Sequence, residues 1–455
     1  IGKYNTATGV NALFSSISGN WNTANGGYAM FQNKQGSANT AAGYKALYDN
    51  KSGNFNTAIG VHALSQNQNS GSNTAIGTYA LWSHRIADGN TAVGASALYS
   101  DTSGIFNTAI GNAALFNNLN GKQNTAVGSL ALYYNKGSQN TAVGYEALAY
   151  NELSSNNVAI GDSALFNHSG SQGFNTAIGS KIMASNTQGY SNTAGGYAAL
   201  YSNTTEGGNT AIGYNALYNT IAGSNTAVGL NALVTNTTGG SNTAVGKNSL
   251  GINTTGYLNT AFGVEALYTV TTGGNNTAIG YDADVSVGNL NYAIVLGANA
   301  TVNASNKVRI GNGSVSVIEG QVAYSWPSDG RFKENIEDDV KGLDFILKLQ
   351  PVSYNFNRLK FAQHVRENIS VEREEILVAQ SQQRSVGFVA QDVEKIIQET
   401  GFSSFDAVHA PTNETDNYSM GYAVFVVPLV KAVQEQQLMI EAQNQKIEFL
   451  LKEIE

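Results

Sequence analysis

The sequence predicts a mainly β protein: an N-terminal parallel β-solenoid of 17-residue coils, followed by a small α+β domain that ends in a coiled-coil helix. Three observations predict this fold class. One short unit recurs 17 times, the composition changes abruptly at Ser328, and the final segment has a heptad pattern. A unit of this length cannot bury its own apolar face, so it becomes stable only by stacking on its neighbours.

The repeat is Asn-Thr-Ala-Ile/Val-Gly followed by Ala-Leu, and it runs from Asn5 to Gly280 with three one-residue slips in spacing. Seventeen residues are too few for a helical hairpin or a leucine-rich coil, which need about 33 and about 20 to 29 residues. A coil rich in Gly, Asn, Thr and Ser favours two short strands and two turns. We assign residues 1–288 to this β-solenoid shaft.

The coil that begins at Asn56 shows how the side chains are expected to divide. Strand alternation places Thr57 and Ile59 on one face and Asn56 and Ala58 on the other. We expect the Ile/Val and Leu rows to fill the lumen, the Thr row to point partly inward, and Ala to permit close approach. Gly60 is expected to have a positive φ or to leave room for a neighbouring backbone.

Residues 289–327 are predicted to form a β-rich neck, because Val, Ile and Tyr alternate there with polar residues up to Trp326 and Pro327. From Ser328 the charged residues and Gln become frequent. Helical patterns are predicted over residues 338–349 and 391–400, the second one capped by Gly401.

The last stretch, residues 427–455, predicts one long coiled-coil helix with Pro428 in its first turn. Mixed β-branched and polar core positions are typical of coiled coils with a defined register, and this pattern is compatible with a trimer. An amphipathic helix packed on its own domain is the alternative. The two core rows are Val433, Ile440, Ile447 and Ile454, and Val430, Gln437, Asn444 and Leu451.

Charge is divided unevenly along the chain. Residues 1–327 hold 11 Lys/Arg and 11 Asp/Glu, whereas residues 328–455 hold 13 and 21. A neutral shaft without a basic stripe argues against nucleic-acid binding. We expect no membrane insertion, because no apolar run of about 20 residues is evident. The chain has no Cys and opens at Ile1 without an initiator Met or a signal peptide, so we expect a fragment or processed product, and no cofactor or metal site.

Other polar and aromatic residues have simpler structural explanations. The five His residues lack ligand spacing, and the pair Asp282 and Asp284 fits a degenerate last repeat. Asp338 and Asp339 fit a helix N-terminus, where the dipole favours acidic residues. Tyr residues recur after the repeat Gly or Leu, where they could bind glycans or stack between coils. The residues concerned are His62, His84, His168, His364 and His409, and Tyr44, Tyr79, Tyr99, Tyr145, Tyr214 and Tyr268.

Ser328 and Lys333 form the one pair with catalytic potential. A serine hydroxyl is a poor nucleophile until a base takes its proton, and lysine can do so only as the neutral amine. A free lysine has a pKa of about 10.4, so burial or a neighbouring cation would have to depress it. On spacing alone, a Ser-Asp-Gly turn followed by Lys is ordinarily a solvated loop.

Several separated motifs in residues 328–455 occur in the order found in one family. They are Ser328, Asp329, Arg331, Lys333 and Ile336, then Gly342-Leu343, Leu349-Gln350-Pro351-Val352, Tyr354, Gly387-Phe388-Val389-Ala390-Gln391, Val393, and the helix of residues 432–436. They resemble the intramolecular chaperone domain of endosialidases and phage tail spikes, which assembles a trimeric fibre and then cuts itself off. The resemblance implies that Ser328 is the nucleophile, that Lys333 is its base, and that the bond between Pro327 and Ser328 is cut.

The shaft in turn resembles the YadA-like head of trimeric surface adhesins, whose repeat also places a small polar residue, Ala, Ile and Gly in series. The adhesin repeat is shorter, and here Thr occupies a position that is usually apolar.

These observations predict a homotrimeric, extracellular structural fibre, either a tail fibre or a surface adhesin. Its C-terminal domain would drive trimerisation and then release itself in a single self-cleavage, with no activity on external substrates. A phage, an injection apparatus and a bacterial surface all remain open, as do a cell-surface receptor and a glycan as partners. The alternative is a ligand-binding solenoid that holds glycan or ice through Thr or Tyr rows without self-cleavage. A glycosidase is not supported, because no pair of carboxylates recurs in an apolar setting.

Overall fold

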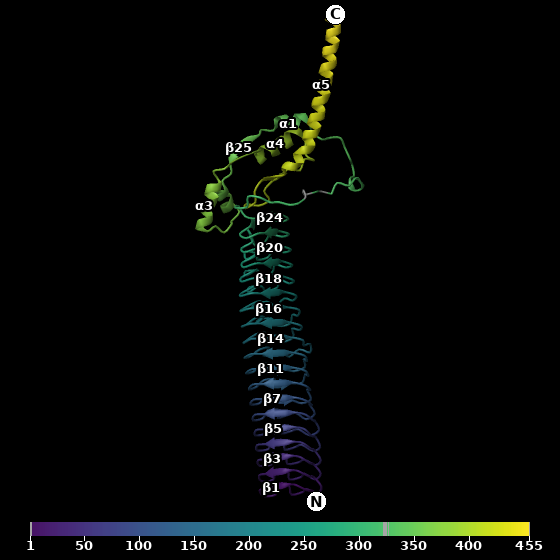
Figure 1. The fold of residues 1–455 in the computed structure, drawn as a ribbon, viewed down its shortest axis with the longest axis vertical. Coiled ribbons are helices and arrows are strands. Elements are labelled where there is room, and N and C mark those ends of the chain that lie inside the picture. Colours follow the sequence, from purple (N-terminus) through teal and green to yellow (C-terminus); the bar gives the residue numbers. More distant parts are fainter. Residues whose placement is uncertain (1, 322–324, 326, 455) are drawn as a thin grey trace. The chain divides into compact units, whose positions relative to one another are not determined.

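The computed structural model describes residues 2–321, 325 and 327–454. The chain divides into two compact units, Ile1–Tyr292 and Ala293–Glu455 (Figure 1). The first is a parallel β-solenoid of 17-residue coils and the second is a small α/β region with a long terminal helix, so the predicted fold class is confirmed.

Each coil of the first unit contributes one three-residue strand to a parallel sheet. These strands are β1 (Thr6–Thr8), β2 (Thr23–Asn25), β3 (Thr40–Ala42), β4 (Thr57–Ile59), β5 (Thr74–Ile76), β6 (Thr91–Val93), β7 (Thr108–Ile110), β9 (Thr125–Val127), β11 (Thr141–Val143), β13 (Val158–Ile160), β14 (Thr176–Ile178), β15 (Thr193–Gly195), β16 (Thr210–Ile212), β17 (Thr226–Val228), β18 (Thr243–Val245), β19 (Thr260–Phe262) and β20 (Thr277–Ile279).

A second strand per coil, which the sequence pattern favours, is present in only a few coils. These strands are two residues long: β8 (Asn117–Asn118), β10 (Tyr134–Asn135), β12 (Tyr150–Asn151) and β21 (Asp284–Val285). Elsewhere in the described part of the first unit, turns and bends occupy the rest of the coil. The expectation of two strands per coil is therefore wrong for most coils, because the residues after the repeat Gly turn too tightly to stay extended.

Strand pairing is in register along the sheet of the first unit, with Ala opposite Ala and with Thr opposite Thr except at Val158 of β13. Thr57 of β4 pairs with Thr74 of β5, and Ala58 pairs with Ala75. The one-residue slips do not disturb this register, because Thr125 of β9 still pairs with Thr141 of β11. Insertions and deletions are therefore absorbed in the turns.

The lumen is filled by different rows from those expected. Ala58, Ala63 and Leu64 are 0% exposed, whereas Ile59 is 40% exposed on the outer face of the sheet. The alternation along the strand is as predicted, and so is the inward position of Leu. The inward placement of the Ile/Val row is wrong, and the Thr row lies on the outer face with it. The strand's inward positions are taken by Asn and Ala, so that only small strand side chains face the lumen.

Buried asparagines link each coil to the next. The backbone N–H of Asn73 donates to Oδ1 of Asn56 at 3.0 Å, and Nδ2 of Asn56 donates to the carbonyl of Ser70 at 2.9 Å. A second row is bonded in the same way, with Nδ2 of Asn67 donating to Oδ1 of Asn50 at 2.8 Å. These amides are buried, and the contacts of Asn56 with Asn73 and of Asn50 with Asn67 each join neighbouring coils.

The repeat glycine has both properties that were predicted for it. Gly60 has φ 136°, and a Cβ placed on it would lie 2.5 Å from the carbonyl oxygen of Gly77 in the next coil. Other residues of the same coil also have left-handed backbone, including His62 at φ 56° and Leu64 at φ 51°. Such conformations are strained for residues with a side chain, so an isolated coil is not a stable structure.

The second unit contains short strands, five α-helices and two 3₁₀ turns in its described residues. Its elements are β22 (Ile294–Leu296), β23 (Thr301–Val302), β24 (Val308–Ile310), η1 (Gly330–Phe332), α1 (Leu343–Lys348), β25 (Val352–Asn355), α2 (Arg358–His364), α3 (Val371–Gln380), β26 (Arg384–Gly387), α4 (Ala390–Thr400), β27 (Val408–His409), β28 (Ser419–Met420), η2 (Tyr422–Phe425) and α5 (Val426–Ile454).

The core of the second unit is mainly aromatic. Phe345 of α1 is 0% exposed, and its ring lies 5.4 Å from that of Phe402 and 5.2 Å from that of Phe405. Val393 of α4 and Phe425 of η2 complete the buried cluster. Helices α1 and α4 and the start of α5 are thus held around one small core.

The helix boundaries differ from the predictions at one end. Helix α4 ends at Thr400 and is capped by Gly401, which has φ 62°, as predicted. Helix α1 begins only at Leu343, after Gly342, and not at residue 338. Asp338 and Asp339 therefore do not lie at a helix N-terminus. The ammonium of Lys431 in α5 instead donates to Asp338 Oδ1 at 2.9 Å.

Helix α5 is 29 residues long and has Pro428 in its first turn, as predicted. Its apolar seam is open to solvent in the single chain. Judged by length and composition only, the segment Tyr422–Ile454 could cross a membrane, with a mean hydropathy of 1.2 in its most apolar window. This finding differs from the expectation of no such run, but one such helix is weak evidence for a span. The exposed seam residues are Val433 (62%), Ile440 (50%), Ile447 (54%) and Ile454 (82%).

We predict that the first unit is less stable at alkaline than at acidic pH because of Asp284. This residue takes the place of the buried Leu, and burial raises its pKa to about 7, although the backbone N–H of Thr269 and Val285 donate to its carboxylate. An unfolded Asp has a pKa of about 3.9, so the folded state binds the extra proton, and stability falls as pH rises from about 4 to about 8. The total change is at most about 4 kcal/mol, since one pKa unit corresponds to about 1.4 kcal/mol.

Thermal unfolding followed by circular dichroism between pH 5 and pH 8 would measure this slope. Asp284→Asn should remove it, whereas Asp88→Asn, a change at an exposed aspartate of the same unit, should leave it intact. An unchanged slope in Asp284→Asn would show that another group is responsible.

Candidate functional site

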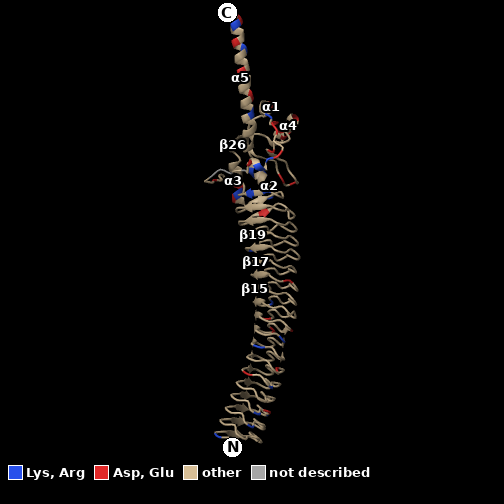
Figure 2. Cartoon of the chain, turned by 90° about the vertical axis from the view of Figure 1, so that its right-hand side faces the viewer, with Lys and Arg blue, Asp and Glu red and all other residues tan. Residues whose placement is uncertain are grey.

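The outer face of the solenoid sheet carries no charge over its whole length. In none of the 17 copies does a charged residue occupy the Thr or the Ile/Val position, although residues 1–288 contain 19 charged residues elsewhere. Figure 2 shows how sparsely the charged residues are distributed along the first unit. The apolar row is well exposed. Its members include Ile76 (38%), Ile110 (41%), Ile178 (49%), Ile212 (41%), Phe262 (56%) and Ile279 (49%).

This uncharged face, defined by the Thr and Ile/Val rows of β1–β7, β9, β11 and β13–β20, differs from other columns of the same coils. The second residue after the repeat Gly, for example, is charged in several copies: Lys45, Glu146, Lys181, Glu265 and Asp282. A long uncharged face that exposes many Ile, Val and Phe side chains is typical of a surface that another molecule covers.

Ser328 and Lys333 lie together at the start of the α/β region. The ammonium of Lys333 donates to Oγ of Ser328 at 2.8 Å. The turn η1 between them brings the two side chains to one side, and it is capped by Asp329, whose Oδ1 accepts from the backbone N–H of Arg331 at 2.9 Å. Both side chains of the pair are exposed in the single chain.

An ion pair fixes the same turn. The guanidinium of Arg331 contacts Asp329 Oδ2 through two nitrogens, at 2.9 Å and 2.6 Å. These hydrogen bonds lower the pKa of Asp329 and raise that of Arg331. Phe332, which lies between Arg331 and Lys333 in the sequence, is 80% exposed. The turn therefore holds the serine and lysine side by side, but leaves them and an aromatic ring in water.

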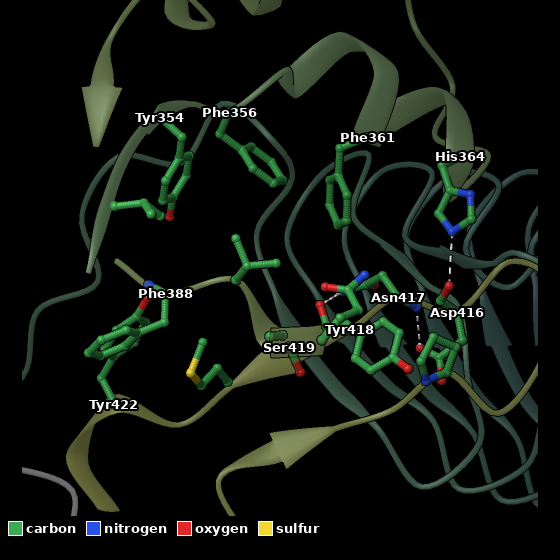
Figure 3. A pocket seen from close by; sticks show the side chains of 16 residues that line it. Tyr354, Phe356, Phe361, His364, Phe388, Asp416, Asn417, Tyr418, Ser419 and Tyr422 are labelled. Atoms are coloured by element: carbon green, nitrogen blue, oxygen red, sulfur yellow. Dashed lines mark hydrogen bonds between the residues drawn. The ribbon is translucent and has the colours of Figure 1, made fainter. Parts of the chain in front are cut away.

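A groove of about 670 Å³ lies elsewhere in the α/β region (Figure 3). Aromatic side chains from β25, α2 and the segment around β26 and η2 surround it. In Figure 3 the rings of Tyr354, Phe356 and Phe361 lie on one side, with Phe388 and Tyr422 below them. Neither Ser328 nor Lys333 is among the described residues that line it.

One end of the groove is polar and is built around Asp416, whose side chain is 0% exposed. Lys307 Nζ lies 2.8 Å from its Oδ1, and His409 Nε2 lies 2.9 Å from its Oδ2. The backbone N–H groups of Thr412 and Asn417 also donate to it. Burial by itself would raise the pKa of Asp416, but these hydrogen bonds outweigh it and hold the pKa well below the usual range.

A second buried carboxylate is that of Glu367, whose side chain is also 0% exposed. It lies between two guanidiniums: Arg309 contacts Oε1 at 2.8 Å, and Arg373 contacts Oε2. Burial lowers the pKa of Arg309, while the charge of Glu367 opposes that change. The described residues contain no cluster of three or more His, Cys, Asp or Glu that could hold a metal ion.

The sequence of the region that holds the Ser328–Lys333 turn has a known family pattern. Residues 328–402 match the family model described as chaperone of endosialidase. The predicted resemblance is thereby confirmed for this C-terminal segment, which follows the β-solenoid. A search of curated proteins found no match to the chain. The matched range contains the serine and lysine, but it ends before Asp416 and before α5.

Sequence reasoning identified the serine and lysine through this resemblance, and the structure places them in contact. It did not identify the groove or the two buried carboxylates. His364 and His409 were expected to be structural, and in the structure they contact the backbone carbonyl and the carboxylate of Asp416. The motif Asn-Glu-Thr-Asp-Asn around Asp416 resembles an ordinary polar loop, so the sequence carried no clear signal.

Proposed function

We propose that the chain forms a homotrimeric extracellular fibre, whose C-terminal domain brings three copies together and then cuts itself from the shaft. The chaperone-of-endosialidase match and the β-solenoid fit a trimeric fibre with a C-terminal chaperone. The observation that carries the proposal is the uncharged face, which leaves a row of half-exposed Ile, Val and Phe unpartnered along the shaft. Covering this row is favourable by about 25 cal/mol per Å² of apolar surface.

A second copy of the chain is the partner that fits this face. All coils repeat at the inter-strand spacing of about 4.8 Å, so two copies side by side present the same rows at the same pitch. That identity creates a problem, because a shift by one coil gives almost the same contacts. A C-terminal helper that aligns three chains first would select one register.

Helix α5 is the element suited to set that register. Its exposed apolar seam contains Gln437 and Asn444 at core positions, and buried polar residues at such positions favour one alignment over others. Three copies of α5 in a coiled coil would cover the seam, and this arrangement accounts for its apolar composition without a membrane.

Self-cleavage would use the contact between Lys333 and Ser328. Oγ of Ser328 attacks the carbonyl carbon of Pro327 while neutral Lys333 takes its proton and passes it to the α-nitrogen of Ser328. The peptide C–N bond breaks and an ester forms between Pro327 and Ser328 Oγ. Water then hydrolyses the ester, leaving a carboxylate on Pro327 and a free hydroxyl and amine on Ser328.

Assembly would switch this chemistry on. In the single chain the ammonium of Lys333 donates to the serine, which is the wrong direction for a base. A lysine accepts a proton only as the neutral amine, and removal of water favours that form. Contact with neighbouring copies around the exposed Phe332 would exclude water, so that cleavage follows trimerisation. Cutting after assembly makes unfolding effectively one-way.

We predict that a double substitution in the uncharged face prevents trimerisation. Ile110→Lys with Ile178→Lys would bring like charges together between copies, which costs several kcal/mol. Light scattering should give the mass of three chains for the wild type and of one chain for the variant. Ser96→Lys, at a position that is Lys in other coils, is the matched control and should remain trimeric.

A trimeric double variant would show that the copies meet through another face. A monomeric wild type would contradict the proposal and leave the Thr rows open to solvent. Ice binding would then be the function to test, by thermal hysteresis.

We predict that Ser328→Ala and Lys333→Ala each give one full-length band of about 47.9 kDa on a denaturing gel, whereas the wild type gives two. Ser325→Ala, at a serine just before the cut, should cleave like the wild type. Mass spectrometry of the smaller product should find Ser328 at its N-terminus. Cleavage at the same bond in both variants would eliminate the dyad.

A further inference from the structure

Buried polar contacts connect the two sides of the proposed cut within the second unit. Lys307 and Arg309 lie upstream of Pro327, in and next to β24, whereas their carboxylate partners Asp416 and Glu367 lie downstream. These ion pairs therefore hold the segment upstream of the cut to the segment downstream of it without a covalent bond. A break between residues 327 and 328 would remove none of the groups that form these contacts.

Neutral contacts reinforce the two ion pairs. Nδ2 of Asn303 donates to the carbonyl of Thr415 at 2.7 Å, and Nδ2 of Asn413 donates back to the carbonyl of Asn303 at 2.8 Å. A guanidinium nitrogen of Arg358 donates to the carbonyl of Gly313 at 2.7 Å. Each segment thus donates hydrogen bonds to the other and accepts hydrogen bonds from it, so the polar groups of the two segments are complementary.

Desolvation makes this contact resistant to salt. The guanidinium of Arg309 lies 5.2 Å above the ring of Phe361, and the side chains of Asp416 and Glu367 are 0% exposed. Buried charge pairs are screened by salt much less than exposed ones. Removing one member of such a pair leaves the other charge without a partner in the interior, which is strongly unfavourable.

We infer that residues 303–313 and the surface around Asp416 and Glu367 form a retention interface, which keeps the C-terminal domain bound to the shaft after the chain is cut. The partner of this surface is the chain's own segment upstream of the cut. Cutting and release are then separate steps, and release requires these ion pairs to open. The inference rests on the proposed function for the cut itself.

The test separates retention from self-cleavage by supplying the cut from outside. A recognition sequence for a specific protease is inserted between Pro327 and Ser328 in a Ser328→Ala background, and the protein is cut and passed over a sizing column. The two fragments should co-elute at about 0.15 M and at about 1 M salt. With Lys307→Met and Arg309→Met together, they should separate. Lys431→Met, which removes only the exposed pair with Asp338, is the control and should not separate them.

Circular dichroism of the uncut variants checks that they fold, and Asn303→Ala with Asn413→Ala offers a milder variant that should weaken co-elution while keeping all charges. Immediate separation of the unmutated fragments would overturn the inference, as would full co-elution of the Lys307 and Arg309 variant. Neither result would bear on whether Ser328 cuts the chain.

A second inference concerns the shaft, where aromatic side chains stack between coils at the position after the repeat Leu. Ring centroids of Tyr99 and Phe116 are 4.9 Å apart, and those of Tyr201 and Tyr218 are 5.1 Å apart with planes inclined by 3°. These distances match the rise of one coil, about 4.8 Å. Where consecutive coils carry an aromatic residue at this position, their rings therefore form a stacked column.

The column is interrupted where this position is not aromatic, at Ser65, Ala149, Ala184, Val234 and Gly251, and the interruption at Ala184 coincides with a pocket. The rings before and after it are Phe166 and Tyr201, two coils apart, so the gap has room for one more flat ring. A pocket of about 270 Å³ is found there. Polar side chains surround it, and its other lining residues are Glu146, Ser163, Asn167, Lys181 and Ser185.

We propose that this gap binds one pyranose ring of a surface polysaccharide. A pyranose has apolar C–H faces, which would pack against Phe166 and Tyr201, and a polar edge of hydroxyls, which would reach Glu146, Asn167 and Lys181. A purely aromatic guest would leave that polar rim without partners. Glu146 and Lys181 belong to the column that is charged in several coils, so this side of the shaft is suited to face solvent.

Saturation-transfer NMR with the whole protein and a panel of neutral hexoses and their oligosaccharides tests this site. At least one sugar should show saturation of its ring C–H protons, and Ala184→Phe, which fills the gap with the missing ring, should abolish it. Val234→Phe adds a ring to the same column outside the pocket and should leave the signal unchanged. Signals that persist in Ala184→Phe, or no signal from any sugar with the wild type, would overturn the proposal.

Discussion

Each coil of the shaft depends on the next one for hydrogen bonds that it cannot make alone. The buried amide of Asn56 accepts from the backbone N–H of Asn73, which begins the following coil, and donates to the carbonyl of Ser70 near the end of its own coil. A buried amide without partners costs more than a typical hydrogen bond contributes. The repeat glycine is also required for steric reasons, because a Cβ at Gly60 would collide with the backbone of Gly77 in the next coil. Stacking is therefore a requirement of every coil, and the strained φ angles at His62 and Leu64 raise the cost of leaving one unstacked.

This dependence determines which parts of the structure could be predicted. The 17-residue period, the alternation along the strand and the role of glycine follow from sequence, because stacking constrains all three. The choice of inward face does not follow from hydrophobicity. Asn56 is buried while Ile59 is exposed, since the asparagine is needed for coil-to-coil bonds and the narrow lumen accepts Ala58 and Leu64. Sequence patterns reveal that two faces differ, but not that the more polar one is inside.

The Ser328–Lys333 turn could be predicted from the sequence, whereas the buried ion pairs of Asp416 and Glu367 could not, because the two differ in the sequence separation of their partners. Ser328 and Lys333 are five positions apart, and one turn brings them into contact, so a local motif could identify them. The partners Lys307 and Asp416 are 109 positions apart, and Arg309 and Glu367 are 58 apart. Nothing local in either segment indicates its partner. Long-range polar contacts of this kind become visible only when the fold is known.

The distribution of charge suggests why assembly would begin at the C-terminus. The shaft presents an uncharged face that gains from any contact with a similar face, so it offers many near-equivalent alignments and little discrimination between them. The C-terminal part carries 34 of the 56 charged residues and an apolar seam interrupted by Gln437 and Asn444. In the proposed trimer its contacts would be few and specific, and a wrong alignment would bury unpaired polar groups. Specific contacts that form first would then decide the register in which the non-specific face closes, and a later cut could not reverse that choice.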